Sequence, residues 1–121
     1  IIGGSCVYFF LLLTRQVLDV MLERGVNLEC TTQYQDTPLL QAASKGMAEA
    51  VRYLIDHKAN VNAVNQFGQT PLHVAVENGN RATILLLLKN GARKDLKAKD
   101  LGTPFDIAIK EHKDEVLSWL K

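Results

Sequence analysis

The sequence reads Thr70-Pro71-Leu72-His73 near its middle, and variants of this stretch stand at a fixed distance on both sides. They are Thr37-Pro38-Leu39-Leu40 and Thr103-Pro104-Phe105-Asp106, each offset by 33 residues from the central copy. Other positions recur at the same offset, and we call each such set of aligned positions a column. One column is an alanine four positions after each proline, at 42, 75 and 108. Agreement at this many columns indicates an internal repeat, which has to be recognised before any single element is assigned.

The repeated columns suit a pair of short helices. A threonine side chain caps a helix N-terminus, and the proline after it fits the first helical position, where its missing N–H costs nothing. The small alanine suits a helix that approaches its neighbours closely. Gly46 and Gly79 then end that helix in the left-handed region. A second helix follows, with an apolar face at Val51, Leu54 and Ile55 in one copy and at matching positions in the next.

These residues resemble the ankyrin-repeat family. The marks are the Thr-Pro-Leu-His-x-Ala signature at 70–75, the 33-residue period and Asn-Val-Asn-Ala after a helix at 60–63. The resemblance covers about residues 17–121. It implies an all-α repeat solenoid of stacked antiparallel helix pairs joined by β-hairpin fingers. We expect one domain over 1–121 in which neighbouring units complete each other's core, with a degenerate repeat at 1–31, full repeats at 32–64 and 65–97, and a C-terminal cap at 98–121.

Some positions depart from the family pattern. Lys58 and His112 stand where the family usually has glycine, so each is expected to carry modest backbone strain or to shift the helix end. Gly68 fills the glycine column of its finger, whereas Gln35 and Leu101 replace it in the adjacent copies. The shape of those two fingers therefore stays open.

The N-terminus departs furthest. Phe9 and Phe10 fall in columns that hold small or aliphatic residues in the other copies, and would overpack a regular repeat by about 1–3 kcal/mol. We expect residues 1–13 to form a displaced helix or to pack on a surface outside this chain. One alternative is self-association into a homodimer through the apolar run from Val7 to Leu13.

Composition excludes several classes of protein. The chain has 121 residues, of which 47% are apolar and 22% charged, with a formal net charge of +1. These values are typical of a globular domain. A net charge this small does not attract nucleic acid or an acidic membrane by long-range electrostatics. The longest apolar run, Cys6 to Leu13, has eight residues, short of the roughly 20 that span a bilayer. Two cysteines, Cys6 and Cys30, favour a reducing intracellular setting, cytoplasmic or nuclear, although a single bridge between them stays open.

No constellation of residues predicts catalysis. The family resemblance implies a structural hydrogen bond for His73, while His57 and His112 are expected at exposed helix ends. Acid and base stand side by side at 111–115, but general acid–base catalysis needs positioned partners, and the sequence shows none. No spacing suits a metal ion and no glycine-rich loop suits a phosphate. We therefore expect no enzyme activity, no metal and no cofactor.

A protein partner is the expected ligand. The resemblance implies contacts at the finger tips and at the exposed end of the first helix of each pair. Tyr34 and Phe67 share a column one repeat apart, so we expect them side by side, at roughly the 8–10 Å of packed helices. Exposed aromatic residues commonly anchor interfaces, although Phe67 could instead fold back on the neighbouring finger. The predicted contact residues are Gln33, Tyr34, Asp36, Ser44, Lys45, Gln66, Phe67, Gln69, Glu77, Asn78, Lys99, Asp100, Lys110 and Glu111.

A basic cluster surrounds the last full finger, at Lys89, Arg93, Lys94, Lys97 and Lys99. It could meet an acidic partner surface, but ordinary solvated lysines are the simpler interpretation. No aromatic residues interleave with these charges to stack bases, so we expect no nucleic acid partner.

Two further hypotheses follow from the resemblance. Asn62 lies at the finger position where ankyrin repeats are often hydroxylated by an asparaginyl hydroxylase. Separately, the stretch from Leu101 to Ile109 looks faintly like the final repeat of Arf GTPase-activating proteins with ankyrin repeats. The chain would then be the regulatory or targeting domain of a larger enzyme.

Overall fold

The computed structural model describes residues 15–25, 29, 31 and 34–120. The expectations for Phe9, Phe10, the two cysteines, Gln33 and the run from Val7 to Leu13 lie outside these residues. The described part contains the helices α2 (Arg15–Glu23), α3 (Pro38–Ser44), α4 (Ala48–Asp56), α5 (Pro71–Asn78), α6 (Arg81–Lys89), α7 (Pro104–Lys110) and α8 (Asp114–Leu120).

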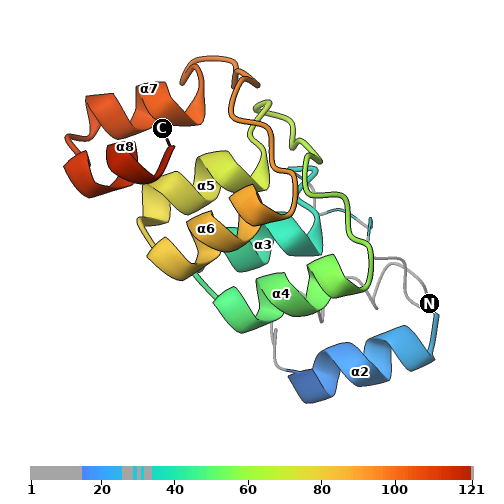
Figure 1. Cartoon of the computed structure of the whole chain (residues 1–121). Helices are drawn as coiled ribbons and strands as arrows, with labels where there is room; N and C mark the ends of the chain where they lie inside the picture. The colour runs from blue at the N-terminus through green and yellow to red at the C-terminus, as the bar shows by residue number, and fades with distance from the viewer. Residues whose placement is uncertain (1–14, 26–28, 30, 32–33, 121) are drawn as a thin grey trace.

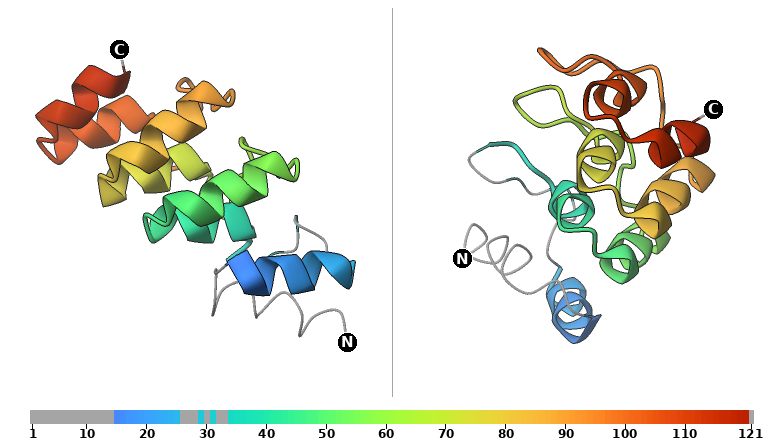
Figure 2. Two further views of the ribbon diagram at one scale, coloured as in Figure 1. Left: turned by 60° about the horizontal axis from the view of Figure 1, so that its bottom comes forward. Right: turned by 90° about the vertical axis from the view of Figure 1, so that its left-hand side faces the viewer.

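The helices stack in two layers. One layer is α3, α5 and α7, each packed on the next, and the other continues from α2 through α4 and α6 to α8. Figure 1 shows α4 and α6 in front of α3 and α5. The second view of Figure 2 shows the connecting loops projecting from the side of the α3, α5 and α7 layer. This is the helical repeat solenoid that the sequence predicts.

The three Thr-Pro stretches begin α3, α5 and α7 as expected. Thr37, Thr70 and Thr103 are N-cap residues with extended backbone, and each hydroxyl accepts a backbone N–H three residues later. Each following proline occupies the first turn, where the helix has no partner for an N–H. The helices α3, α5 and α7 therefore begin at equivalent positions of the repeat, and their N-termini lie beside the loops.

Two helix ends carry the strain that their sequence predicts. Lys58 and His112 have φ angles of +71° and +56°, where the other copies place glycine at Gly91 and Gly79. A side chain in the left-handed region costs roughly 1–2 kcal/mol, because its Cβ crowds the following carbonyl.

The fingers are hairpins made of turns. In the last finger Ala98 and Gly102 form an isolated antiparallel bridge, with N···O distances of 2.8 and 3.2 Å. In the finger before it, the N–H of Asn65 donates to Gln69 O at 3.1 Å. In both fingers the bonded residues flank the turn, and residues 34–120 contain one isolated bridge and no strand. The residue with a positive φ angle also differs in column between the fingers. It is Gly68 in one finger and Gly102 in the next, one position after the column of Gly68.

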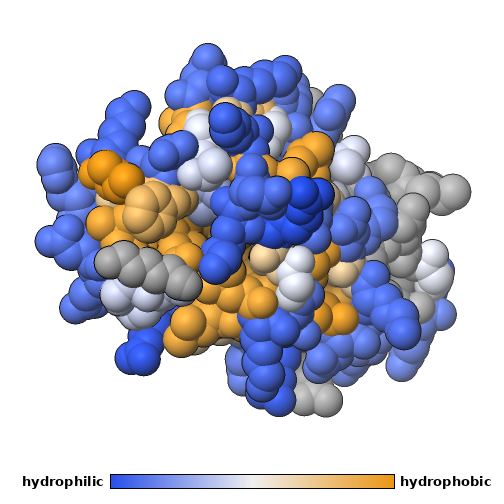
Figure 3. Space-filling model, turned by 45° about the horizontal axis from the view of Figure 1, so that its top comes forward, coloured by the Kyte–Doolittle hydropathy of each residue, from blue (hydrophilic) through white to orange (hydrophobic). Residues whose placement is uncertain are grey.

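The core lies between the layers and repeats the sequence columns. The alanines at 42, 75 and 108 are fully buried where α3, α5 and α7 meet, which confirms the close approach expected there. The column after the alanine becomes exposed to solvent in α7. Ile109 is 50% exposed, while Val76 one repeat earlier is fully buried. Figure 3 shows a face with apolar patches set among polar side chains that form most of its outline.

Candidate protein-binding surface

Tyr34 and Phe67 stack on each other at the finger tips. Their ring centroids are 6.5 Å apart with an interplanar angle of 27°, and the two residues are 48% and 49% exposed. The rings are closer than packed helix axes because a backbone bond joins the fingers, from Gln66 N to Tyr34 O at 3.0 Å. The pair is side by side as expected. Phe67 leans on the neighbouring finger and keeps half of its surface in solvent.

Below the aromatic pair, Asn65 organises a chain of polar side chains. Asn65 is 6% exposed, and its Oδ1 accepts the backbone N–H groups of Phe67 and Gln69 at 2.9 and 3.1 Å. Its Nδ2 donates to Asp36 Oδ1 at 2.9 Å and to Gln69 Oε1 at 3.1 Å. The buried amide thus fixes the turn of its own finger and ties it to the preceding one.

Two carboxylates of this chain are held by amide donors. Gln41 Nε2 donates to Asp36 Oδ2 at 3.2 Å, and Gln69 Nε2 donates to Glu77 Oε1 at 3.0 Å. The chain thereby runs from α3 across the finger to the end of α5. It orients both carboxylates toward the space between the fingers and the first helix layer.

That space is a groove of about 320 Å³, which we call the finger groove. Leu40 and Val74 supply apolar surface from α3 and α5, and none of the described residues that line it is a lysine, arginine or histidine. Its lining residues are Tyr34, Asp36, Leu40, Gln41, Ser44, Asn65, Phe67, Gln69, Val74 and Glu77.

The groove's electrostatics centre on Glu77. Burial raises the pKa of this carboxyl above its usual range, and the nearby charge of Glu111 raises it further. The charge of Lys113 and the Gln69 amide act in the opposite direction. The Lys113 ammonium donates to the backbone oxygen of Glu77 at 2.7 Å and lies 3.6 Å from Glu111 Oε1.

The structure gathers some of the predicted contact residues and separates others. The predicted residues that line the finger groove are Tyr34, Asp36, Ser44, Phe67, Gln69 and Glu77. Other predicted residues are exposed or half-buried along the same edge and outside the groove lining, namely Lys45, Gln66, Asn78, Lys99, Asp100, Lys110 and Glu111. Gln66 and Lys99 carry the backbone bonds between fingers, since Lys99 N donates to Phe67 O at 3.0 Å.

Asn78 has a structural partner. Its Nδ2 donates to Ser44 O at 3.3 Å, which joins the ends of α5 and α3. A Cβ at Gly46 would approach Asn78 Oδ1 to 2.6 Å, so the glycine is needed for this close approach as well as for its backbone angle. The amide of Asn78 therefore holds two repeats together.

Sequence reasoning missed the centre of the polar chain. Asn65 has no counterpart in its column, which holds Thr32 and Ala98 in the other copies, so the repeat alignment gave no signal for it. Gln41 was missed for the same reason, because Val74 and Ile107 replace it. Only the fold shows that these amides hold the carboxylates of Asp36 and Glu77.

The side chain of Asn62 bridges two repeats. Its Nδ2 donates to Gly91 O at 3.2 Å, and its Oδ1 accepts the N–H of Arg93 at 2.8 Å. Its own N–H donates to Asn60 Oδ1 at 2.9 Å. The amide group is engaged in these contacts, and its Cβ would be the atom modified by hydroxylation.

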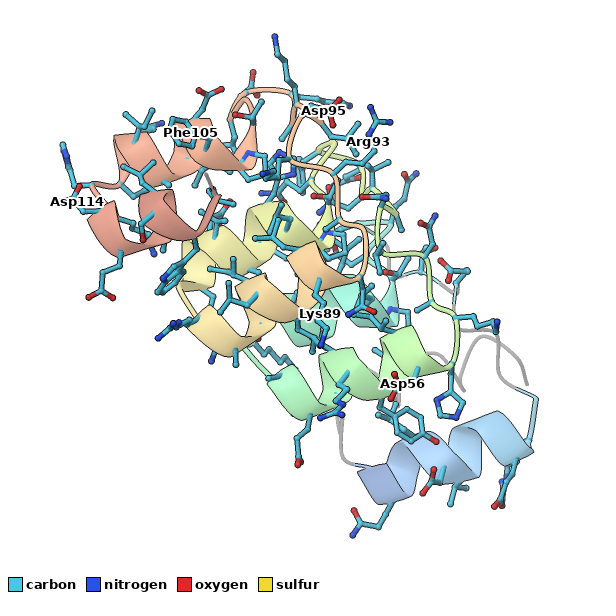
Figure 4. All side chains as sticks on the ribbon, in the orientation of Figure 1. Asp56, Lys89, Arg93, Asp95, Phe105 and Asp114 are labelled. Atoms are coloured by element: carbon cyan, nitrogen blue, oxygen red, sulfur yellow. The ribbon has the colours of Figure 1, made fainter. Side chains whose placement is uncertain are left out.

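The basic cluster is divided in the structure. Arg93 pairs with Asp95 at 2.7 Å on the loop after α6, and Figure 4 shows the two side chains together, away from Lys89. Lys94 donates to the carbonyl of Leu120 at 3.2 Å. Arg93 and Lys94 of the cluster thus make local contacts at separate places.

His73 has the structural role expected of it. It is fully buried, its Nδ1 accepts the N–H of Thr70 at 3.0 Å, and its Nε2 lies 2.9 Å from Gly102 O. Burial lowers its pKa, so the ring is neutral and Nε2 donates to that carbonyl. Sequence reasoning missed this second bond, which ties α5 to the next finger. The described residues contain no group of three or more His, Cys, Asp or Glu that could hold a metal ion.

Similarity to known proteins identifies the family of the chain. The helices within the described residues are all too short or too polar to cross a membrane. A search of the curated proteins finds no match. A family model described as ankyrin repeats, in three copies, matches residues 10–100, which is most of the chain. Together with the capped helix pairs and the projecting fingers, this match shows that the chain belongs to the ankyrin-repeat family.

Proposed function

We propose that this chain is a non-catalytic scaffold that binds a protein partner with its finger tips and the adjoining face of α3, α5 and α7. Ankyrin repeats are generally protein–protein interaction modules and are generally non-catalytic. The observation that carries the proposal is the stacked, half-exposed pair of Tyr34 and Phe67. Large, rigid aromatic side chains lose little entropy on binding and dominate the energetics of many interfaces.

The polar residues around the aromatic pair would provide specificity. Lys45 and Lys110 are exposed at the ends of α3 and α7, and Glu77 is exposed at the end of α5. Charges at the rim of an interface mainly steer association and reject wrong partners. Because the fingers are joined to each other by backbone hydrogen bonds, we expect the surface to bind with little rearrangement.

A photo-crosslinking experiment tests the proposal and captures the partner in the same step. Benzoyl-phenylalanine is placed at Gln66, beside the aromatic pair, in the full chain expressed in cells. As a control it is placed at Leu85, which is 39% exposed on α6 in the other helix layer. We expect a discrete cross-linked species from position 66 that disappears when Tyr34 and Phe67 are both replaced by alanine. The same species at position 85, or its persistence in the double variant, would contradict the proposal.

The alternatives concern the host protein and self-association. A role as the regulatory or targeting domain of a larger enzyme, such as an Arf GTPase-activating protein, is compatible with the same binding surface. Homodimerisation through Val7 to Leu13 involves residues outside the described ranges, and the solution mass tests it. We place the chain inside the cell, in the cytoplasm or the nucleus, as the family typically is.

A further inference from the structure

We propose that the finger groove accepts an arginine side chain of the partner, with its guanidinium between the Glu77 carboxylate and the rings of Tyr34 and Phe67. This inference rests on the proposed function, because it takes the groove to be part of a protein-binding surface. It names the chemistry that the partner would present there.

The size of the groove suits one long side chain. Its volume of about 320 Å³ lies at the lower end of the roughly 300–1,000 Å³ typical of small-molecule pockets. Its lining combines the rings of Tyr34 and Phe67, the apolar side chains of Leu40 and Val74, and the carboxylate of Glu77. An arginine side chain offers surfaces that complement this lining, because it has an apolar stem and a planar cationic head.

The charge of the groove favours a cation. Its lining includes the carboxylates of Asp36 and Glu77 and, within the described residues, no positively charged side chain. The amides of Gln41, Asn65 and Gln69 hold these carboxylates in place but carry no charge. They orient both carboxylates toward the groove, where an anionic partner group would meet like charge.

Glu77 is the groove carboxylate on which this inference depends. Partial burial and the proximity of Glu111 both raise its pKa, which means that its surroundings disfavour the anion. Lys113, whose charge acts on Glu77, directs its ammonium to the backbone oxygen of Glu77 and to Glu111. A cation delivered by a partner would therefore stabilise the charged form of Glu77.

Arginine fits better than lysine because of the aromatic pair. A guanidinium can stack on the exposed face of a tyrosine or phenylalanine ring and at the same time donate hydrogen bonds to a carboxylate. A lysine ammonium is a point charge and cannot share a plane with both groups. A purely apolar side chain would fill the groove but would leave Glu77 further desolvated and without a partner.

The test uses a defined probe and the intact chain. The probe is the tripeptide acetyl-Gly-Arg-Gly-amide, and its matched control carries citrulline, a neutral isostere of arginine. Binding is followed through the backbone amide signals of Phe67, Gln69 and Glu77 in two-dimensional ¹⁵N spectra. We expect saturable shifts with a millimolar Kd for the arginine peptide and binding at least about fivefold weaker for the citrulline peptide.

A pair of variants assigns the effect to the groove. Glu77→Gln keeps the side-chain shape and removes the charge. We expect this variant to bind the arginine peptide at least about fivefold more weakly. Glu115→Gln removes one carboxylate from the exposed surface of α8 and is expected to leave the Kd unchanged. No saturable shift at the groove, equal binding of the two peptides, or an unchanged Kd in Glu77→Gln would each overturn the inference.

The two proposals fail separately. Cross-linking from position 66 can depend on the aromatic pair while Glu77→Gln binds the peptide like the wild type. In that case the surface binds a protein, but the groove does not recognise arginine. If cross-linking is insensitive to the aromatic pair, the proposed function itself is wrong.

Discussion

His73 couples two repeats, and replacing it with leucine removes that coupling with little change in shape. Leucine already occupies this column at Leu40, so the helix tolerates it. In His73→Leu the N–H of Thr70 loses its acceptor inside the protein, which costs about 1–3 kcal/mol. Gly102 O loses the Nε2 donor but keeps the N–H of Ala98 at 2.8 Å, so that loss is smaller. We expect the free energy of unfolding to fall by about 2–3 kcal/mol.

Urea unfolding followed by circular dichroism measures this change. For a domain of this size, 2–3 kcal/mol corresponds to a fall in Tm of about 10 °C. The control variant is His112→Asn, because His112 is exposed with φ +56° and asparagine tolerates that backbone. We expect the control to stay within about 0.5 kcal/mol of the wild type. A His73→Leu protein as stable as the wild type would refute the coupling.

The pH dependence of stability gives an independent test of the same residue. Burial lowers the pKa of His73 in the folded state below its usual value of 6.5, so unfolding takes up a proton as the pH falls below that value. The contribution of neutral His73 is therefore complete above about pH 6.5. It is lost at up to about 1.4 kcal/mol per pH unit as the pH falls toward the folded-state pKa. We expect the slope below pH 6.5 to be smaller in His73→Leu than in the wild type, and equal slopes would contradict the assignment.

Further predictions concern the last helix pair, the N-terminus and the finger. The carboxylate of Asp106 accepts the N–H of Thr103, which lowers the pKa of Asp106. Asp106→Ala should therefore lower the Tm at pH 7 and have less effect below about pH 3.8, where the carboxyl of the unfolded chain is protonated. Calorimetry at both pH values checks this. Light scattering across a concentration series should give a monomer near 13.5 kDa, whereas a dimer abolished by deleting residues 1–13 would establish self-association. Mass spectrometry of protein from cells should find one added oxygen at Asn62, and uniformly unmodified Asn62 would end that hypothesis.

The repeat columns predict those parts of the fold that each copy builds alone. The Thr-Pro starts and the strained ends at Lys58 and His112 follow from a residue and its neighbours within one unit. Such features depend on local capping and backbone sterics, which a sequence displays directly. The buried alanines lie between units and were predicted because they recur at 42, 75 and 108.

The contacts between copies were harder to predict. The bond from His73 to Gly102 and the chain organised by Asn65 join residues about 29 positions apart, and neither recurs in the other copies. The aromatic pair could be predicted because Tyr34 and Phe67 share one column and so lie in adjacent fingers. The groove beneath them could be predicted only in part. Most of its lining consists of column pairs from adjacent repeats. The lining residues that were not among the predicted contacts are Leu40, Gln41, Asn65 and Val74.

The affinity of a partner identified by cross-linking tests the central claim most directly. Isothermal titration calorimetry would compare the wild type with the double variant Tyr34→Ala, Phe67→Ala. If the aromatic pair anchors the interface, its loss should cost at least about 2 kcal/mol of binding free energy, a rise in Kd of about 30-fold. The variant should lose about 1 kcal/mol of folding stability for the ring–ring contact and a further amount for the buried half of each ring, so binding is compared where both proteins are folded. A Kd within about twofold of the wild type would contradict the account.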